Sequence, residues 1–279
     1  MVVKFKYMRK IFPLLVIVLL SWQVMAQNVG QEGDTLRNYI DINGFKQGFW
    51  KKNYDNGNPR FEAYFVDDKP VGELKRWDSY GNLFALLIYD AKGEKAKVFF
   101  YHKNGKMAAT GNYLGKEKDS IWLYYSETNQ LYLQESYSKG IKDGFFRNYT
   151  SEGLLLEEVQ WKNGNKHGVW KKFYPQRGAL MWEATYNEEK LEGEAKSYFE
   201  NGKVYKEGKF VNDLMEGTWM KYNENGGIEK VYHYTKGVSP EAEKEDDAMM
   251  KELLDNKDKF EGPKSGDDLD WLRQPTGRN

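Results

Sequence analysis

The sequence predicts an all-β protein in which one β-hairpin is repeated along the chain. Three observations predict it: a small residue recurs about every 24 residues, an aromatic residue follows it after 17 or 18 positions, and a turn residue lies between the two. We expect an elongated array of about eight 24-residue hairpins over residues 38–238. The array should form a single-layer antiparallel sheet, followed by a short C-terminal helix and a flexible tail.

Five columns of residues keep their spacing from unit to unit, with one extra residue near Pro175 in the sixth unit. The zero column holds Gly48, Gly72, Ala96, Ser120, Gly144, Gly168, Gly193 and Gly217. The second column, two residues later, holds Trp50, Leu74, Val98, Trp122, Phe146, Trp170, Ala195 and Trp219. The fifth column holds Asn53, Trp77, Tyr101, Tyr125, Tyr149, Phe173, Tyr198 and Tyr222. The turn column holds Gly57, Gly81, Gly105, Asn129, Gly153, Gly178, Gly202 and Gly226, and the ring column holds Phe65, Tyr89, Tyr113, Tyr137, Trp161, Tyr186, Phe210 and Tyr234.

The turns and the strands after them have clear signals. Asn-Gly pairs occur at 56–57, 104–105, 201–202 and 225–226, and tight hairpin turns need such residues because they require positive φ. After the turn, Trp182, Ala184 and Tyr186 alternate with the polar residues Glu183 and Thr185. This alternation predicts a sheet with one buried and one hydrated face.

Small residues two positions before the ring column leave room for a ring from a neighbouring strand to lie across the backbone. They are Ala63, Gly111, Ala184 and Gly208. The strand before the turn alternates less cleanly, because its second and fifth columns are three residues apart. Either a bulge or burial of both faces would account for this spacing.

The stretch "GKFVNDLMEGTWMKYNENG" resembles a MORN repeat, and "GNYLGKEKDSIWLYY" and "VQWKNGNKHGVWKKFY" resemble it less strictly. Aromatic residues in place of the second glycine resemble the bacterial variant of this repeat, some members of which are antitoxin-like. The resemblance covers about residues 38–238 and implies a scaffold or binding surface. Ala96, Ser120 and Asn129 depart from the pattern, so their units should be slightly distorted.

The N-terminus has the three-part layout of a secretory signal peptide over residues 1–26. Lys4, Lys6, Arg9 and Lys10 precede the apolar run "IFPLLVIVLL", and Val24 and Ala26 occupy the small-residue cleavage positions. The alternative is an uncleaved membrane anchor. Cleavage would leave a mature chain that begins at Gln27, with a linker over 27–37 and no transmembrane segment. We expect an exported protein in the periplasm or outer cell envelope of a Gram-negative bacterium.

Charge and composition exclude several classes of function. Without residues 1–26 the chain has 38 basic and 42 acidic residues, which is a poor balance for nucleic-acid binding. The chain has no cysteine, so disulfides, thiolate metal sites and a cysteine nucleophile are excluded.

No pattern in the sequence indicates an enzyme, a catalytic residue, a cofactor or a metal site. His102, His167 and His233 form no pair with metal-ligand spacing. Glu135 and Glu157 fall on the face predicted to be buried and are the best candidates for a perturbed acid. The alternative is that a single-layer sheet leaves both hydrated, or that neighbouring lysines pair with them.

Residues 239–279 form a separate C-terminal region with seven basic and twelve acidic residues after Ser239. Ser239 and Pro240 suit a helix N-terminus, and an apolar stripe that includes Met249 and Leu253 predicts a helix over about 240–258. We expect this helix to dock on the last one or two hairpins. The remainder should be flexible, with Trp271 and Leu272 as the candidate partner contact.

The sequence therefore favours a non-enzymatic, exported repeat scaffold that mediates protein–protein interaction in the cell envelope, through a sheet face, an edge or the tail. Its partner would be another envelope protein. Two alternatives are an antitoxin-like immunity protein, as the resemblance implies, and a glycan- or peptidoglycan-binding module that stacks aromatic rings on sugars.

Overall fold

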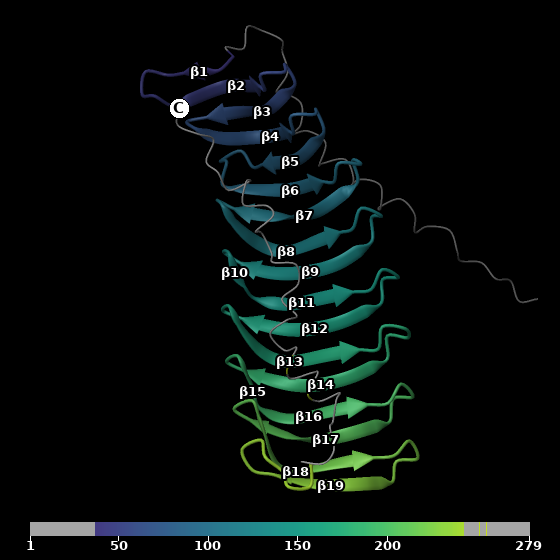
Figure 1. The fold of residues 1–279 in the computed structure, drawn as a ribbon. Coiled ribbons are helices and arrows are strands. Elements are labelled where there is room, and N and C mark those ends of the chain that lie inside the picture. Colours follow the sequence, from purple (N-terminus) through teal and green to yellow (C-terminus); the bar gives the residue numbers. More distant parts are fainter. Residues whose placement is uncertain (1–36, 243–250, 252–254, 256–279) are drawn as a thin grey trace, which may run out of the picture. The chain divides into compact units, whose positions relative to one another are not determined.

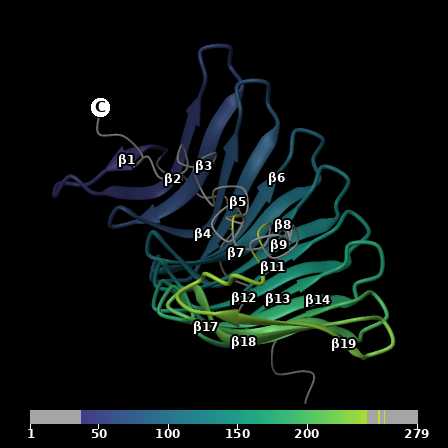
Figure 2. The ribbon, with the colours of Figure 1, turned by 60° about the horizontal axis from the view of Figure 1, so that its bottom comes forward.

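The computed structural model describes residues 37–242, 251 and 255. Within this part of the chain, 19 strands form one open sheet, and consecutive strands pair in antiparallel fashion (Figure 1). The strand direction rotates gradually along the sheet, as Figure 2 shows. The all-β repeat sheet predicted from the sequence is confirmed.

The strands are named in chain order. The first nine are β1 (Tyr39–Ile40), β2 (Lys46–Asn53), β3 (Pro59–Val66), β4 (Lys69–Trp77), β5 (Leu83–Tyr89), β6 (Lys95–Tyr101), β7 (Met107–Leu114), β8 (Glu117–Tyr125) and β9 (Leu131–Ser138). The next five are β10 (Ile141–Lys142), β11 (Gly144–Tyr149), β12 (Leu155–Lys162), β13 (Asn165–Phe173) and β14 (Leu180–Asn187). The last five are β15 (Lys190–Leu191), β16 (Gly193–Tyr198), β17 (Val204–Val211), β18 (Leu214–Tyr222) and β19 (Ile228–Tyr234).

Eight hairpins predict about sixteen strands, and the described residues contain three more. One is β1, which pairs with β2 at the start of the array. The other two are β10 and β15, which are the first residues of strands interrupted at Asp143 and Glu192. Both interruptions lie one residue before the zero column, where the strand pairing between successive units is irregular.

All eight residues of the turn column have positive φ, including Asn129 at 71°. In the first hairpin Gly57 N–H donates to the Tyr54 carbonyl and Tyr54 N–H donates to the Asn58 carbonyl, at 2.9 and 2.8 Å. This combination of a tight turn and a left-handed residue is a common way to close a hairpin of this loop length. Asparagine tolerates the left-handed conformation better than most residues, which explains the substitution at position 129.

The zero column lies where the strand pairing between successive units is interrupted. In β8 the residues between Asp119 and Leu123 face only Gly111 of β7, so the later strand carries two extra residues. Seven of the eight zero residues have positive φ, and Ser120 does so at 60°. Ala96 is the exception, and the β5–β6 pairing is regular around it. The unit of Ala96 therefore differs from the others, because its strand pairing continues without a break at the zero column.

The uneven spacing of the second and fifth columns reflects two faces rather than a break in alternation. Trp219 is buried on one face, whereas Tyr222 lies on the other face and donates its hydroxyl to Glu207 at 2.7 Å. A bulge also occurs beside the fifth column, because the pairing shifts by one residue between Lys221 and Tyr222. Of the two explanations left open by the sequence, the bulge applies, whereas the face that carries the fifth column is not buried.

The buried face, here called the ring face, carries the second and ring columns. Phe210 contacts Trp219 and Trp182 edge to face, with ring centroids 5.2 and 6.2 Å apart. The Trp219 ring lies so close to Gly208 that a Cβ there would come within 2.1 Å of it, and Trp122 covers Gly111 in the same way. The prediction that small residues make room for rings is confirmed at these two glycines. The opposite face is called the outer face.

Side chains at both margins of the sheet connect one unit to the next. At the margin with the hairpin turns, the residue after the fifth column bonds to the next unit's fifth-column carbonyl at Tyr54, His102 and Tyr174, and the Tyr54 hydroxyl donates to the Trp77 carbonyl at 2.9 Å. At the other margin, the acid before the zero column accepts a turn N–H, as Glu216 does from Lys236 at 2.8 Å. Where they occur, these bonds help to fix a hairpin relative to its neighbour.

Replacing Trp219 with Ala should lower the free energy of unfolding by about 3–5 kcal/mol, because the ring is fully buried and a cavity would remain. Lys209 lies beside Phe210 on the outer face and is exposed, so Lys209→Ala should change it by no more than about 0.5 kcal/mol. Urea denaturation of both variants measures the difference. Similar losses would show that the assignment of faces is wrong.

Candidate interaction surfaces

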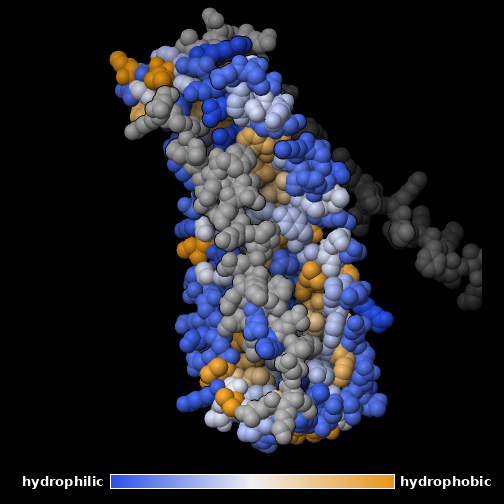
Figure 3. Space-filling view, in the orientation of Figure 1, coloured by the Kyte–Doolittle hydropathy of each residue, from blue (hydrophilic) through white to orange (hydrophobic). Residues whose placement is uncertain are grey.

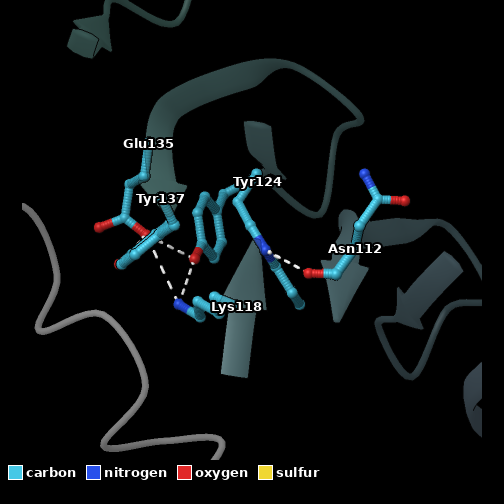
Figure 4. Close-up of polar contacts among 6 residues, drawn as sticks. Asn112, Lys118, Tyr124, Glu135 and Tyr137 are labelled. Carbon is cyan, nitrogen blue, oxygen red and sulfur yellow. Dashed lines mark hydrogen bonds and ion pairs between the residues drawn. The ribbon is translucent and has the colours of Figure 1, made fainter. Parts of the chain in front are cut away.

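A buried polar cluster lies on the ring face between β8 and β9 (Figure 4). The Glu135 carboxylate, 1 % exposed, accepts hydrogen bonds from the hydroxyls of Tyr124 and Tyr137 at 2.6 and 2.9 Å. The Lys118 ammonium lies 3.5 Å from the same carboxylate and 2.6 Å from the Tyr124 hydroxyl. Glu135 is therefore not hydrated. It is paired with a lysine, as one of the sequence alternatives proposed, and with two tyrosines that the sequence did not indicate.

The electrostatics of this cluster keep one of its phenols neutral. Burial, followed by the Glu135 charge, raises the pKa of Tyr124 far above its ordinary value, so the phenol stays neutral and donates. The Lys118 ammonium also lies 5.0 Å from the Trp122 ring centroid. A carboxylate held by two phenols and an ammonium satisfies the hydrogen-bonding needs of a buried charge.

A second buried carboxylate, Glu157, lies on β12 of the same face. It accepts hydrogen bonds from the Trp170 indole at 2.7 Å and from the Asn148 amide at 3.2 Å. Burial raises the pKa of Glu157, and the Trp170 bond and the nearby Lys172 charge offset that rise only in part. The expectation that Glu157 is a perturbed acid is supported, and its environment explains the perturbation.

Lysines accompany the rings along this face. Seven ammonium nitrogens lie between 4.5 and 5.4 Å from the nearest ring-face centroid, a distance at which cation–π attraction operates. They belong to Lys46, Lys118, Lys142, Lys166, Lys172, Lys206 and Lys230. The ring face is thus aromatic and cationic, a property that the sequence reading did not find. Lysine two residues before position zero in four units was the available signal.

The outer face is mostly hydrophilic but carries an exposed apolar row, here called the outer row. Its members are Ile121, Phe145 and Val169, which are 51, 38 and 43 % exposed. Each one follows the zero residue of its unit, so the three occupy equivalent positions in consecutive hairpins. Figure 3 shows how hydrophilic residues dominate the visible margins of the sheet. An exposed apolar row in such surroundings is a candidate contact surface.

The three histidines have separate environments. The His102 ring nitrogen hydrogen-bonds the Tyr125 carbonyl at 2.8 Å, which is one of the bonds between units. The His233 ring nitrogen lies 3.3 Å from Glu241. His167 takes the place of the acid before the zero column and lines an open hollow of about 500 Å³ together with Asp143 and Gln160. Each of the three positions is explained by its place in the array.

Some sequence expectations fall outside the described residues. These are the signal peptide over 1–26, Trp271 and Leu272, and most of the predicted helix over 240–258, although Lys251 and Asp255 are helical. No group of three potential metal ligands was found in the part of the chain that the structure covers. That part of the chain also contains no helix with the length and apolar character that crossing a membrane requires.

Repeated hairpins, conserved in geometry from unit to unit, define this chain as a β-hairpin repeat protein. Residues 191–212, which span the β15–β17 region, match the MORN repeat variant family. The other units share the column residues and turn geometry of this one, so the array is consistent with a MORN-repeat protein. The match does not address the antitoxin-like branch.

Solved structures with a detectable likeness include two of TarM, the first from S. aureus. That structure is of a point mutant in complex with fondaparinux, α-GlcNAc-glycerol and UDP, with 12 % identity, a TM-score of 0.27 and coverage of 34 % of this chain and 19 % of TarM. The second has 12 % identity, a TM-score of 0.21 and coverage of 52 % and 20 %. This chain thus spans about a fifth of TarM, and a likeness this low carries no functional argument. The curated proteins include no significant match.

Removal of Glu135 should be costly, because it would take the carboxylate from Lys118 and both phenols. We expect Glu135→Ala to lower the free energy of unfolding by about 3–5 kcal/mol. The double variant Lys118→Met with Glu135→Leu should lose much less than the sum of the single variants, since both charges leave together. A double-mutant cycle in urea measures this coupling, and additive losses would contradict it.

The raised pKa of Glu157 makes stability depend on pH. The folded state holds this proton more tightly than the unfolded chain, so the contribution of Glu157 to stability falls as pH rises from its ordinary pKa through the raised value. Glu157→Gln keeps the side chain neutral at every pH. Its melting temperature relative to the natural protein should therefore rise between about pH 4 and pH 8.

The matched control is Glu158→Gln on the outer face, where Glu158 pairs with Arg147 at 2.6 Å. This variant should not gain relative stability as pH rises, because it removes a favourable charge pair. Parallel behaviour of the two variants in thermal melts would contradict the role given to burial of Glu157.

Proposed function

We propose that this chain is an exported, non-catalytic repeat scaffold that binds another protein of the cell envelope through its outer row. The observation that carries the proposal is the exposure of three apolar side chains at one repeated position. A solvated strand face normally carries polar residues there, and the array has them at the same position in other units, as at Glu73 and Lys97.

The spacing of the outer row suits an extended contact. One strand lies between each member and the next, so Ile121, Phe145 and Val169 repeat at two strand spacings, or about 10 Å, across the sheet. Phe145 is held by the Arg147 guanidinium, 4.6 Å from its ring centroid, and Arg147 is itself paired with Glu158. An apolar centre with a charged rim is the usual composition of a protein–protein contact.

The glycan-binding alternative has less support from the geometry. Stacking on a sugar requires an accessible ring face, but three tryptophans of the ring face are enclosed. Trp122, Trp182 and Trp219 are each 0 % exposed. No observation on the described residues favours an antitoxin role over a scaffold.

Export is inferred from the basic, apolar and small-residue layout of residues 1–26. Intact-mass measurement of the protein from envelope fractions tests it. A mature chain should begin at Gln27, and a chain that retains Met1 and sediments with the inner membrane would contradict the proposal.

Crosslinking in cells followed by mass spectrometry tests the outer row. The triple variant Ile121→Ser, Phe145→Ser and Val169→Ser should reduce capture of the envelope partner by about tenfold or more, since loss of about 1.4 kcal/mol is a tenfold loss of affinity. The matched control is Glu73→Ser, Lys97→Ser and Glu194→Ser, at the same position in other units. Equal capture by both variants would show that the outer row is not the contact.

A further inference from the structure

We infer that the ring face is a binding surface for an acidic segment, and that its occupant is the chain's own C-terminal segment, residues 243–279. The inference concerns a different face from the outer row and does not depend on the proposed function. It rests on the burial of the ring face, its charge, and the position at which the described chain ends.

Burial of the ring face calls for a cover. A single-layer sheet leaves its faces to solvent unless another element packs on them. Among residues 37–242 no second sheet lies over this face, yet Trp182, Tyr232 and Lys206 are at most 2 % exposed. Neighbouring strands account for part of that burial, because the Trp219 ring lies against Gly208 and the Lys206 ammonium lies 4.7 Å from the Tyr232 ring centroid. Strands of one layer leave the side of these side chains that points away from the sheet open, unless a further element packs on it.

The charge of the ring face selects an acidic cover. Seven lysines of the ring face stand against two buried carboxylates, Glu135 and Glu157, in the described part of the chain. The segment 243–279 contains eleven acidic and seven basic residues, and its first five residues are Glu-Lys-Glu-Asp-Asp. Residues 1–26 have four basic and no acidic residues, so the N-terminus has the wrong charge. Complementary charge on a partly enclosed face is screened less than on an exposed one.

The described part of the chain also ends next to the ring face. After β19, Gly237 N–H donates to the Met215 carbonyl and turns the chain back. Ser239 is buried, and Ala242 packs against the hydrophobic core, which is the ring face. The described chain before the segment therefore ends at that face, with Ala242.

The length of the segment is sufficient. Its 37 residues span about 55 Å if helical and about 120 Å if extended, while each hairpin advances the sheet by about 10 Å. The segment can therefore reach at least five hairpins from the last one. It also supplies apolar side chains, Met249, Leu253 and Phe260 among them, for the aromatic surface.

Zero-length carboxyl-to-amine crosslinking of the purified full chain, with mass spectrometry, tests the inference. Carboxylates of residues 243–279 should join ring-face lysines such as Lys118, Lys166 and Lys206 within one molecule. The yield should fall several-fold between about 0.05 and 1 M salt, because the Debye length shortens to about 3 Å. The outer-face pairs Lys51–Glu62 and Lys196–Glu207, at 2.8 and 3.0 Å, calibrate the reaction.

A matched pair of variants localises the contact. Lys166→Gln on the ring face should remove links to that position and weaken neighbouring ones several-fold, whereas Lys171→Gln on the outer face should leave them unchanged. Circular dichroism checks that both variants fold. If Lys166→Gln does not fold, the salt dependence of crosslinking in the natural chain tests the inference instead.

Three results would overturn the inference. The first is crosslinks of the segment to outer-face lysines as often as to ring-face lysines. The second is crosslinks between isotopically light and heavy molecules in a mixed sample, which would make a second copy the occupant. The third is no crosslink of the segment while the calibrating pairs react.

Discussion

Ring packing across the backbone is the interaction on which this sheet depends. A single layer has no second sheet to bury its apolar face, so each hairpin must bury the rings of its neighbour. Trp122 over Gly111 and Trp219 over Gly208 show how this is achieved, because a side chain at either glycine would occupy the space of the ring. The indole N–H groups then donate to the Asn112 and Lys209 carbonyls, at 3.1 and 3.2 Å. These carbonyls lie next to the interruption in the strand pairing, so one ring both fills space and satisfies the backbone.

The size of the second-column side chain varies along the array, and residues on the neighbouring strand vary with it. Where the second column has tryptophan at 219, the preceding strand has glycine at 208. Where the second column shrinks to Ala195, the preceding strand has Ala184, and the neighbouring Trp182 fills the space between Trp170 and Phe210. The break in the second column at Ala195 is therefore a repacking of the same volume rather than a defect.

Besides forming the core, the ring face carries buried charged groups. A buried carboxylate such as Glu135 is tolerated because two phenols and an ammonium contact it. Lysines over aromatic rings keep their methylene stems on the apolar surface while the ammonium adds positive charge. The two faces thus differ in kind: the ring face is cationic and aromatic, while the outer face carries the outer row and other exposed side chains. Such a difference lets a repeat array present two independent surfaces.

The repeat, the hairpin turns and the buried face were all determined by the sequence, because local rules decide them. Positive φ favours glycine and asparagine, which gives the turn column, and alternation with period two assigns Trp182, Ala184 and Tyr186 to one face. The sequence also placed Glu135 and Glu157 on that face. Only the tertiary structure decided which groups surround these carboxylates, since Lys118, Tyr124 and Tyr137 meet Glu135 across neighbouring strands. It also decided that the second and fifth columns lie on opposite faces and that Ile121, Phe145 and Val169 align in a row. The physical reason is that pairing register and bulges place residues of different units side by side, and the period of a single strand carries no information about the neighbouring strand.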